Sequence, residues 1–224
     1  IVCAELCGAG HAIMRAQLYA GLNPLFLDTE TTGLSETDEI CEIAILDAQG
    51  NLLINSLLKP TIPIPPNAST IHSITDEMVK GAPTFRDLLP HLEQILRGRE
   101  VLVYNLEFDM GKIAQSARAN GCAFADGEAW YWAFQTGEQT PDGRAVYYRY
   151  WHCMMEMYAK FYGDWNDYHE NYRWQRLGSA ALQCGIELPL GTHRAHADAE
   201  TTRQILLYMA GREISNKENS NEQS

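Results

Sequence analysis

Two acidic residues, separated by a single residue, stand near the start of the chain. Asp28 and Glu30 follow the apolar run Leu25-Phe26-Leu27. In a β-strand, side chains at positions i and i+2 point to the same face, so these carboxylates would lie side by side at the end of a buried strand. Adjacent carboxylates repel each other, and a hard cation such as Mg²⁺ offsets that repulsion because it prefers oxygen ligands. The pair predicts a metal site if the chain supplies further ligands; otherwise it is a solvated strand end.

Three more residues that could do chemistry occur later in the chain. Asp109 follows the apolar run Val103-Tyr104 and would lie in the first turn of a helix, near the end of its strand, where open α/β sheets gather ligands. Asp198 lies early in a C-terminal helix, and His193 stands in the loop before it. Taken singly, each acid is explained as a partner of the helix dipole and the histidine as a solvated loop residue. Only their occurrence in one chain indicates a shared site.

The elements that must position these residues alternate between strands and helices. We expect strands over 25–28, 40–47, 52–58 and 101–104, and helices over 3–20, 84–97, 107–120, 177–184 and 195–212. The first three strands would form an antiparallel meander. This order predicts a mixed α/β sheet with helices packed on it.

Composition limits the class of protein. A chain of 224 residues is long enough for one domain with a substantial core. Its net charge of -12 argues against a binder that holds nucleic-acid backbones by charge alone. It does not argue against a nuclease, because bound metal ions reverse the sign of the local charge. No apolar stretch approaches the roughly 20 residues that span a bilayer, so we expect no membrane association.

The ends of the chain and its cysteines suggest where it works. Glu5, His11 and Arg15 interrupt the N-terminal segment, which therefore does not read as a signal peptide. The chain begins at Ile1 rather than Met, which leaves open what precedes it. None of the six cysteines forms a C-x-x-C pair, a pattern typical of free thiols in a reducing compartment. We expect a cytoplasmic protein with one domain over 1–214 and a polar, disordered tail over 215–224.

At this point the sequence resembles the DEDDh exonucleases, the DnaQ-like or ribonuclease T-like superfamily with a ribonuclease H-like fold. The matching motifs are Phe26–Leu34, Val103–Asp109 and His193–Ala199, with Ile71–Val79 similar to the segment that these enzymes place near the substrate end. Ser73 stands where many members have Gly, and Leu106 where Ala is common. Neither difference removes a functional group. The resemblance implies a ribonuclease H-like mixed sheet, with an antiparallel meander followed by parallel strands.

The resemblance also implies a role for each acidic residue. Two ions, Mg²⁺ or Mn²⁺, would occupy the site, with Asp28 bridging both. Glu30 and Asp198 would hold one ion, and Asp109 would support the other. Such a pair of ions stabilises the attacking and the leaving oxygen of a phosphodiester.

His193 would take the proton from the attacking water by the same resemblance. Histidine suits this role because it changes charge near neutral pH. His196 is the competing candidate, since it is only two residues from Asp198. The two histidines would face different directions from the C-terminal helix, and the family spacing favours His193.

The resemblance predicts a metal-dependent 3′→5′ exonuclease that releases 5′-mononucleotides from a free 3′ end, with DNA favoured over RNA. Two alternatives remain: an accessory or proofreading subunit of a larger nucleic-acid processing complex, and an oligoribonuclease-like phosphodiesterase on short substrates. The second alternative follows from the acidic surface, which attracts the phosphate backbone of a long nucleic acid only weakly. The candidate residues for substrate binding are Thr31, Leu34, His72, Asn105 and Phe108.

An aromatic-rich insertion is expected over about 126–176. This segment contains all five tryptophans and most of the tyrosines of the chain. Its aromatic side chains could stack on single-stranded bases, or form a packed subdomain or a contact with a protein partner. The helical spacing of Met154, Met157 and Phe161 favours a packed helix. We therefore favour packing or partner contact over base stacking.

Overall fold

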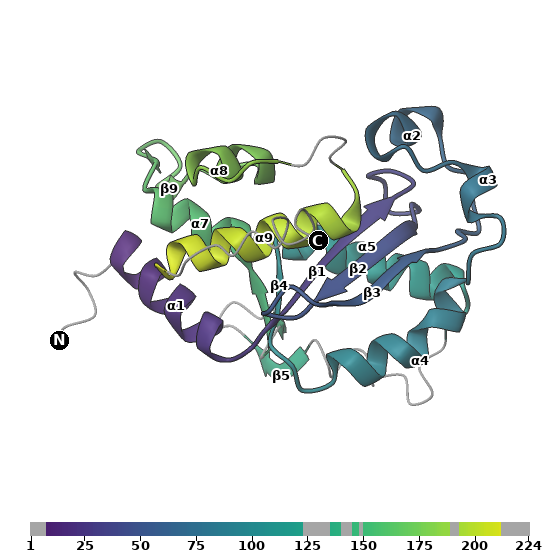
Figure 1. The fold of residues 1–224 in the computed structure, drawn as a ribbon, viewed down its shortest axis with the longest axis horizontal. Coiled ribbons are helices and arrows are strands. Elements are labelled where there is room, and N and C mark those ends of the chain that lie inside the picture. Colours follow the sequence, from purple (N-terminus) through teal and green to yellow (C-terminus); the bar gives the residue numbers. More distant parts are fainter. Residues whose placement is uncertain (1–7, 123–134, 140–144, 148–149, 189–192, 212–224) are drawn as a thin grey trace, which may run out of the picture.

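The chain folds into a mixed five-stranded sheet with helices on both faces (Figure 1). The computed structural model describes residues 8–122, 135–139, 145–147, 150–188 and 193–211. The strands are β1 (Leu25–Thr31), β2 (Ile40–Leu46), β3 (Leu52–Leu57), β4 (Val101–Val103), β5 (Gln135–Gln139), β6 (Ala145–Tyr147), β7 (Trp151–Cys153), β8 (Trp165–Asn166) and β9 (Asn171–Tyr172). The helices are α1 (Ala9–Gly21), α2 (Pro66–His72), α3 (Asp76–Val79), α4 (Phe85–Leu96), α5 (Leu106–Ala119), α7 (Met154–Tyr162), α8 (Leu177–Gln183) and α9 (Ala195–Met209).

The central sheet has the strand order β3-β2-β1-β4-β7. β1 pairs antiparallel with β2, and β2 antiparallel with β3, which confirms the predicted meander. β4 runs parallel to β1, and β7 runs parallel to β4. The carboxyl ends of β1 and β4 therefore lie at the same edge of the sheet, where the segments that follow them can meet.

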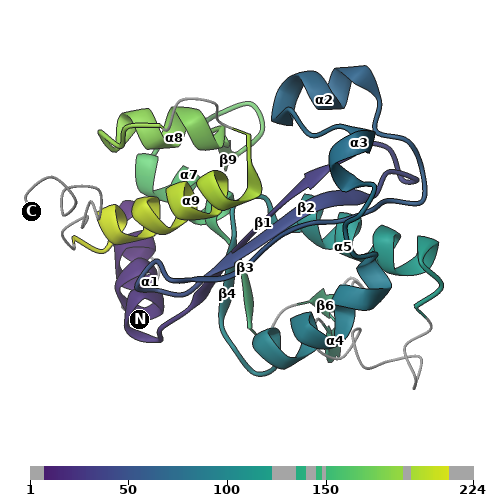
Figure 2. The same ribbon diagram turned by 45° about the vertical axis from the view of Figure 1, so that its right-hand side comes forward.

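β1 sends alternate side chains into two different cores. Phe26 packs in the core beneath α1, α7, α8 and α9, whereas Leu25 and Leu27 pack in the core beneath α4 and α5. Figure 2 shows the two helix layers on opposite sides of the sheet. Because strand side chains alternate with period two, Asp28 and Glu30 share the face of Phe26.

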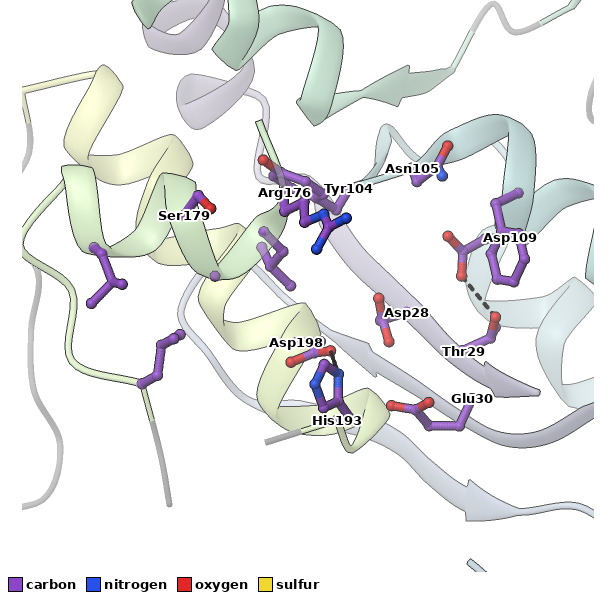
Figure 3. A pocket seen from close by; sticks show the side chains of 15 residues that line it. Asp28, Thr29, Glu30, Tyr104, Asn105, Asp109, Arg176, Ser179, His193 and Asp198 are labelled. Atoms are coloured by element: carbon purple, nitrogen blue, oxygen red, sulfur yellow. Dashed lines mark hydrogen bonds and ion pairs between the residues drawn. The ribbon is translucent and has the colours of Figure 1, made fainter. Parts of the chain in front are cut away.

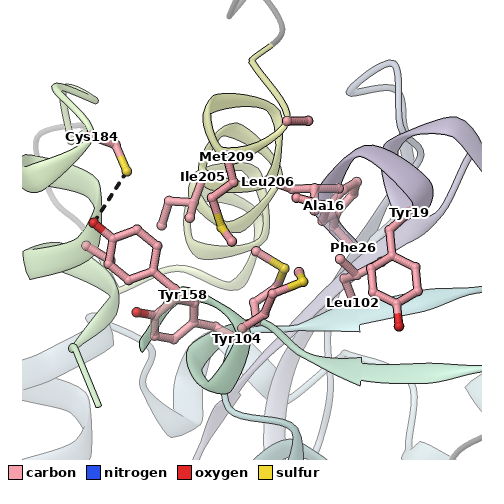
Figure 4. Packing of buried hydrophobic residues seen from close by; sticks show 14 of the residues in the cluster. Ala16, Tyr19, Phe26, Leu102, Tyr104, Tyr158, Cys184, Ile205, Leu206 and Met209 are labelled. Atoms are coloured by element: carbon pink, nitrogen blue, oxygen red, sulfur yellow. Dashed lines mark hydrogen bonds between the residues drawn. The ribbon is translucent and has the colours of Figure 1, made fainter. Parts of the chain in front are cut away.

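The core that supports α9 is drawn in Figure 4. Leu206 and Met209 of α9 pack there with Tyr158 of α7, and all three side chains are buried. The Tyr158 hydroxyl donates to Gln183 Oε1 at 3.0 Å, so the one polar atom of this ring is satisfied. α9 is thus fixed against the sheet along its length, and its first turn is held over β1 and β2.

The helices of the other layer begin where the sequence indicates. The predicted N-cap Thr84 accepts from the Asp87 N–H, and the Asp87 carboxylate accepts from the Thr84 N–H, which completes a capping box. α5 begins at Leu106, within one residue of the predicted start. β1 differs from its prediction, because it continues three residues beyond Asp28 to Thr31. Asp28 and Glu30 consequently lie within a paired strand, whereas the prediction placed Asp28 at its last position and Glu30 beyond it.

The range predicted for the aromatic insertion, about 126–176, includes residues that belong to the main sheet and its helices. Trp151 is the first residue of β7, pairs with Val101 of β4 and is buried. The following helix α7 packs on α1 and α9. Residues 151–162 are therefore part of the main sheet and its helix layer. Periodicity could not reveal β7, since three residues are too few to show an alternation.

The described residues do not test the other predictions about the chain's organisation. Residues 123–134, 140–144 and 148–149 of the aromatic-rich segment, and the predicted tail over 215–224, lie outside the described residues. The single domain over 1–214 and the cytoplasmic location stay predictions. Within the described part of the chain, no helix combines the length and apolar character that crossing a bilayer requires.

Candidate active site

A cavity of about 520 Å³ opens at the carboxyl edge of the sheet, between α5, α8 and α9 (Figure 3). All five residues predicted to do chemistry line it: Asp28, Glu30, Asp109, His193 and Asp198. They come from β1, from the first turns of α5 and α9, and from the loop before α9. The fold therefore gathers residues that are up to 170 positions apart in the sequence.

Three of the carboxylates form a compact group. One oxygen from each of Asp28, Glu30 and Asp198 lies within 4.8 Å of the others. β1 supplies the first two from one face, and α9 crosses that face with Asp198 in its first turn. A set of carboxylate oxygens at this spacing matches the ligands that hard divalent cations prefer.

Asp109 lies in the same cavity, deeper in the protein. It is 3% exposed, and its Oδ1 accepts a hydrogen bond of 2.7 Å from the Thr29 hydroxyl. Thr29 stands between Asp28 and Glu30 on β1 and faces the α5 side of the sheet. The strand thus supplies two carboxylates from one face and orients a third from the other.

Burial and mutual repulsion disfavour the charged forms of these acids. Burial, followed by repulsion from Asp198 and Glu42, raises the pKa of Glu30 from 4.5 to about 8. Burial also raises the pKa of Asp109 to about 7, against the hydrogen bond from Thr29. The pKa of Asp28 is raised well above its usual value by burial and by the surrounding carboxylates. A cation placed among them would reverse each of these effects.

The metal-free protein is expected to lose stability as the pH rises. Because the folded-state pKa of Glu30, about 8, lies above its ordinary 4.5, its contribution to stability is fully present below pH 4.5 and is lost as the pH rises through 8. Saturating Mg²⁺ or Mn²⁺ should restore about 3 kcal/mol at 100 times the dissociation constant. We expect the melting temperature at pH 8 to rise by roughly 5–10 °C over that in chelator.

Differential scanning calorimetry at pH 5.5 and pH 8, with chelator or with metal, tests this expectation. The metal-induced shift should be clearly larger at pH 8, where the ligands lose fewer protons on binding than at pH 5.5. An equal shift at both pH values would contradict the coupling between the carboxylate cluster and the cation.

His193 stands at the mouth of the cavity. Its side chain is 59% exposed, and Nδ1 lies 3.9 Å from Asp198 Oδ2. Its backbone has a left-handed φ of 79°, which is uncommon outside glycine. His196 lies on α9, is exposed and is not among the residues that line the cavity. The two histidines thus face different surroundings.

An ion pair fixes the start of α9. The Arg194 guanidinium donates from Nε to both carboxylate oxygens of Glu42, at 3.0 and 2.9 Å, and contacts Glu42 again through its terminal nitrogen. The Ala195 N–H, at the first position of α9, donates to the same carboxylate at 2.9 Å. Glu42 is 2% exposed and pairs across the strands with Glu30. The pair therefore links the cluster's sheet to the segment that carries His193 and Asp198.

Removing the two partners of this pair should have unequal effects. Arg194→Ala leaves a buried carboxylate without its cation and is expected to cost about 2–3 kcal/mol, less than for a fully buried pair because Arg194 is partly exposed. Glu42→Gln should cost about 1 kcal/mol or less, because the amide oxygen still accepts from Ala195 and a charge leaves the crowded cluster. Urea unfolding of both variants and of the double variant measures the difference. A Glu42→Gln variant as unstable as Arg194→Ala would contradict this account.

Two of the five predicted substrate residues line the cavity. Asn105 is exposed at the N-cap of α5, and Phe108 is half-buried with the Lys112 ammonium 5.3 Å from its ring centroid. Thr31 and Leu34 do not line it: Thr31 is buried with its hydroxyl donating to Gly33 O, and Leu34 is 86% exposed on the following loop. Their contact with substrate stays a prediction.

His72 does not line the cavity, and its contact with substrate stays a prediction. Its side chain is 3% exposed, Nδ1 accepts from the Ile74 N–H at 3.0 Å, and Nε2 lies 3.2 Å from Thr31 O. Both ring nitrogens are used inside the protein, so His72 holds the end of α2 to the end of β1. Ser73 adopts a left-handed φ of 60° just after it and turns the chain there.

The opposite wall of the cavity contains residues that the sequence analysis did not name as site residues. Tyr104 donates its buried hydroxyl to Gln175 O at 2.7 Å, which ties the end of β4 to the segment before α8. Arg176 and Ser179, both exposed, line the cavity beside it. Arg176 brings a cation to the wall of the same cavity, and the sequence indicated it only as one basic residue of the aromatic segment.

Comparison with known proteins gives a consistent result. The model of the family described as "RNase_T: Exonuclease" matches residues 25–206. The chain is 34% identical over 192 residues to the "Uncharacterized exonuclease CP81" of Escherichia phage 186, covering 86% of this chain and 90% of that protein. It is 32% identical over 97 residues to the DNA polymerase III subunit epsilon of Pasteurella multocida, covering 39% of this chain and 38% of that subunit.

Solved structures share the fold. Exonuclease X in complex with 5′ overhanging duplex DNA aligns with a TM-score of 0.51 and 22% identity, over 84% of this chain and 92% of that one. E. coli exonuclease I in complex with a dT13 oligonucleotide aligns with a TM-score of 0.59 and 20% identity, over 82% and 40%. Together with the strand order, these neighbours confirm the predicted ribonuclease H-like architecture.

Proposed function

The chain belongs to the RNase_T exonuclease family, in its DEDDh-type, DnaQ-like branch, and from this premise we propose that it hydrolyses nucleic acid from the 3′ end and releases 5′-mononucleotides. One observation carries the proposal: Asp28, Glu30 and Asp198 meet within 4.8 Å in a cavity that Asp109 and His193 also line. Carboxylates crowded in this way are suited to divalent cations, and an open cavity beside them leaves room for a phosphodiester.

The donors fit Mg²⁺ or Mn²⁺, because all are carboxylate oxygens. We propose that two ions are held, with Asp28 shared, Glu30 and Asp198 on one side and Asp109 on the other. When bound, such ions polarise the scissile phosphate and offset the charge of the entering and leaving oxygens. The hydrogen bond from Thr29 keeps Asp109 in place for this role.

His193 is the proposed general base. Its exposed ring at the mouth of the cavity can reach a water molecule beside the carboxylates, and its Nδ1 lies 3.9 Å from Asp198 Oδ2. The ion pair of Glu42 with Arg194 holds the adjoining backbone. The chain's own groups thus take the proton and orient the residue that takes it.

The terminal nucleotide is proposed to bind against Asn105 and Phe108, with Arg176 near its phosphate. Asn105 offers an amide that can donate to a 3′-hydroxyl, and the Phe108 ring offers a face for a base. Leu34 and Thr31 stay candidates for contact with the same nucleotide from the other side of the cluster.

The names of similar proteins bear on which nucleic acid is the substrate and on whether the protein works within a larger complex. Exonuclease X and exonuclease I were solved with DNA, which supports DNA as the proposed substrate here. Similarity to the epsilon subunit of DNA polymerase III favours a second candidate, a proofreading or accessory nuclease within a larger complex. Tyr162, Trp165 and Tyr168 are exposed and offer a surface for such a partner.

One assay tests the proposal. 5′-Labelled single-stranded and duplex DNA and RNA are incubated with Mg²⁺ or Mn²⁺, with chelator as the control. A ladder that shortens by one nucleotide from the 3′ end, only with metal, supports a 3′→5′ exonuclease. Activity confined to oligomers of a few nucleotides would favour the phosphodiesterase alternative. Cutting that resists chelator, or only internal cuts, would overturn the proposal.

A further inference from the structure

A second cavity, of about 830 Å³, adjoins the cavity that holds the carboxylates, which is called the active cleft below. The two share Asn105 and Phe108 at the start of α5, so the second cavity begins where the proposed site of the terminal nucleotide ends. From there it extends along β7 and α7 to Arg15 of α1. Its volume lies within the roughly 300–1,000 Å³ usual for ligand cavities. A chain that enters the active cleft could therefore continue into it.

Apolar and aromatic side chains form part of its lining. Phe108 and Met155 are half-buried, and Trp174 is 65% exposed. Trp174 does not stand on a free loop, because the next residue, Gln175, accepts the Tyr104 hydroxyl through its carbonyl oxygen. A large indole held at a cavity and left open to solvent is unusual, since burial of such a side chain is favourable.

The charges in the second cavity are balanced. Its lining contains two basic residues, Arg15 and Lys160, and two acidic ones, Glu107 and Glu156. Lys160 is exposed and makes no ion pair within the described part of the chain. The protein as a whole carries a net charge of -12. Compared with that background, this surface does not repel a polyanion, and one lysine is open to a phosphate.

We propose that the second cavity binds the nucleotides that precede the scissile phosphate in a single-stranded 3′ end, with bases stacked on Trp174 and a backbone phosphate at Lys160. This inference rests on the proposed function and adds the class of substrate. Stacking on an aromatic side chain requires an exposed base face, which a paired strand does not offer. The enzyme should therefore favour an unpaired 3′ end several nucleotides long over a blunt duplex.

The experiment compares substrates with and without preceding nucleotides. Thymidine 5′-(4-nitrophenyl phosphate) has a scissile diester and no upstream nucleotide, whereas dT4, dT8 and dT12 extend upstream. For the wild-type protein, kcat/KM should rise with oligonucleotide length to a plateau. Trp174→Ala should lower kcat/KM on dT12 by about 5- to 150-fold, the range for one stacked base. Its rate on the nitrophenyl diester should stay within twofold.

Matched variants make the result specific. Trp165→Ala removes an exposed tryptophan outside the second cavity and should leave the length dependence unchanged. Trp174→Phe should recover most of the loss, because a smaller aromatic face remains. Lys160→Gln should reduce the slope of log kcat/KM against log salt by about 0.7 on dT12, as for one phosphate contact.

The outcomes separate this inference from the proposed function. A Trp174→Ala variant with the wild-type length dependence would overturn the second cavity as a strand site and leave it to a protein partner. A wild-type protein that hydrolyses none of these substrates with Mg²⁺ or Mn²⁺ would overturn the proposed function itself. Equal loss on the nitrophenyl diester and on dT12 would also overturn the inference, because Trp174 would then act on the active cleft.

Discussion

Replacing Asp28 with Asn is expected to lower the metal-dependent exonuclease rate by at least about 10³-fold, which corresponds to roughly 4 kcal/mol of transition-state stabilisation. Asp28 is the carboxylate that the other acids surround: burial, Asp109, Asp198 and Glu30 all raise its pKa. It is therefore the proposed ligand common to both ions. An amide at this position keeps the size of the side chain but loses one anionic oxygen and the charge.

The same substitution should make the metal-free protein more stable. An acid whose pKa is raised by folding destabilises the folded state once it is ionised, so its removal is favourable at pH 8. Calorimetry in chelator should show a higher melting temperature for Asp28→Asn than for wild type, and the shift induced by metal should largely disappear. Activity and stability would thus change in opposite directions.

Asp38→Asn is the matched control for this variant. Asp38 lies outside the cavity, and although burial opposes it, hydrogen bonds from Ser35 and Thr32 hold its pKa below the usual value. Its replacement should lower stability, leave the metal-induced shift intact and preserve activity within a few-fold. An Asp28→Asn protein that keeps near-normal turnover would remove Asp28 from the metal site. One that is less stable than wild type in chelator would contradict the role of repulsion.

Replacing His193 with Ala is expected to reduce kcat by about 10²- to 10⁴-fold, the range for loss of a positioned general base. Metal binding should be retained, because the group of side chains that could hold a metal ion consists of Asp28, Glu30 and Asp198 and does not include His193. The metal-induced rise in melting temperature at pH 8 should therefore remain within about 2 °C of the wild-type value. Loss of turnover with retained metal binding distinguishes a base from a ligand.

His196→Ala is the companion variant. His196 is exposed on α9, two positions before Asp198, and does not line the cavity. Its turnover should stay within twofold of wild type in a single-turnover assay on a labelled oligonucleotide. The reverse pattern, with His196→Ala inactive and His193→Ala active, would assign the proton transfer to His196 instead.

The position of each acid could be predicted from local patterns. Asp28 and Glu30 follow an apolar run at a spacing that places them on one face of a strand, and Asp109 and Asp198 each fall in the first turn of a helix. These signals depend on a few neighbouring residues and give the place of each acid, whereas the gathering of the acids into one site was implied by the resemblance to the DEDDh exonucleases. The parallel pairing of β1 and β4, which brings these segments together, was implied by the resemblance, whereas the order of the elements predicted only a mixed sheet.

The ion pair that supports the site could not be predicted in this way. Glu42 and Arg194 are separated by 152 residues and share no local pattern. Glu42 reads as one polar residue in an apolar strand, and Arg194 as one basic residue near the third motif. The burial of His72 could not be predicted for a related reason: whether its ring faces solvent or the interior depends on the turn at Ser73 and on contacts with Thr31. Side-chain partners across the fold are set by packing, which a single sequence does not display.

The alternation along β1 has a consequence for how this protein can change over time. One face of the strand carries Phe26, Asp28 and Glu30, and the other carries Leu25, Leu27 and Thr29. Deleting or inserting a single codon within the strand would move the residues on one side of the change to the opposite face. Carboxylates would then point into a hydrophobic core, or leucines into the cavity that holds the acids. Point substitutions can be sampled one at a time, but frame-preserving indels here would remove fold and chemistry together. Length variation among descendants should therefore accumulate in connecting segments and be absent from this strand.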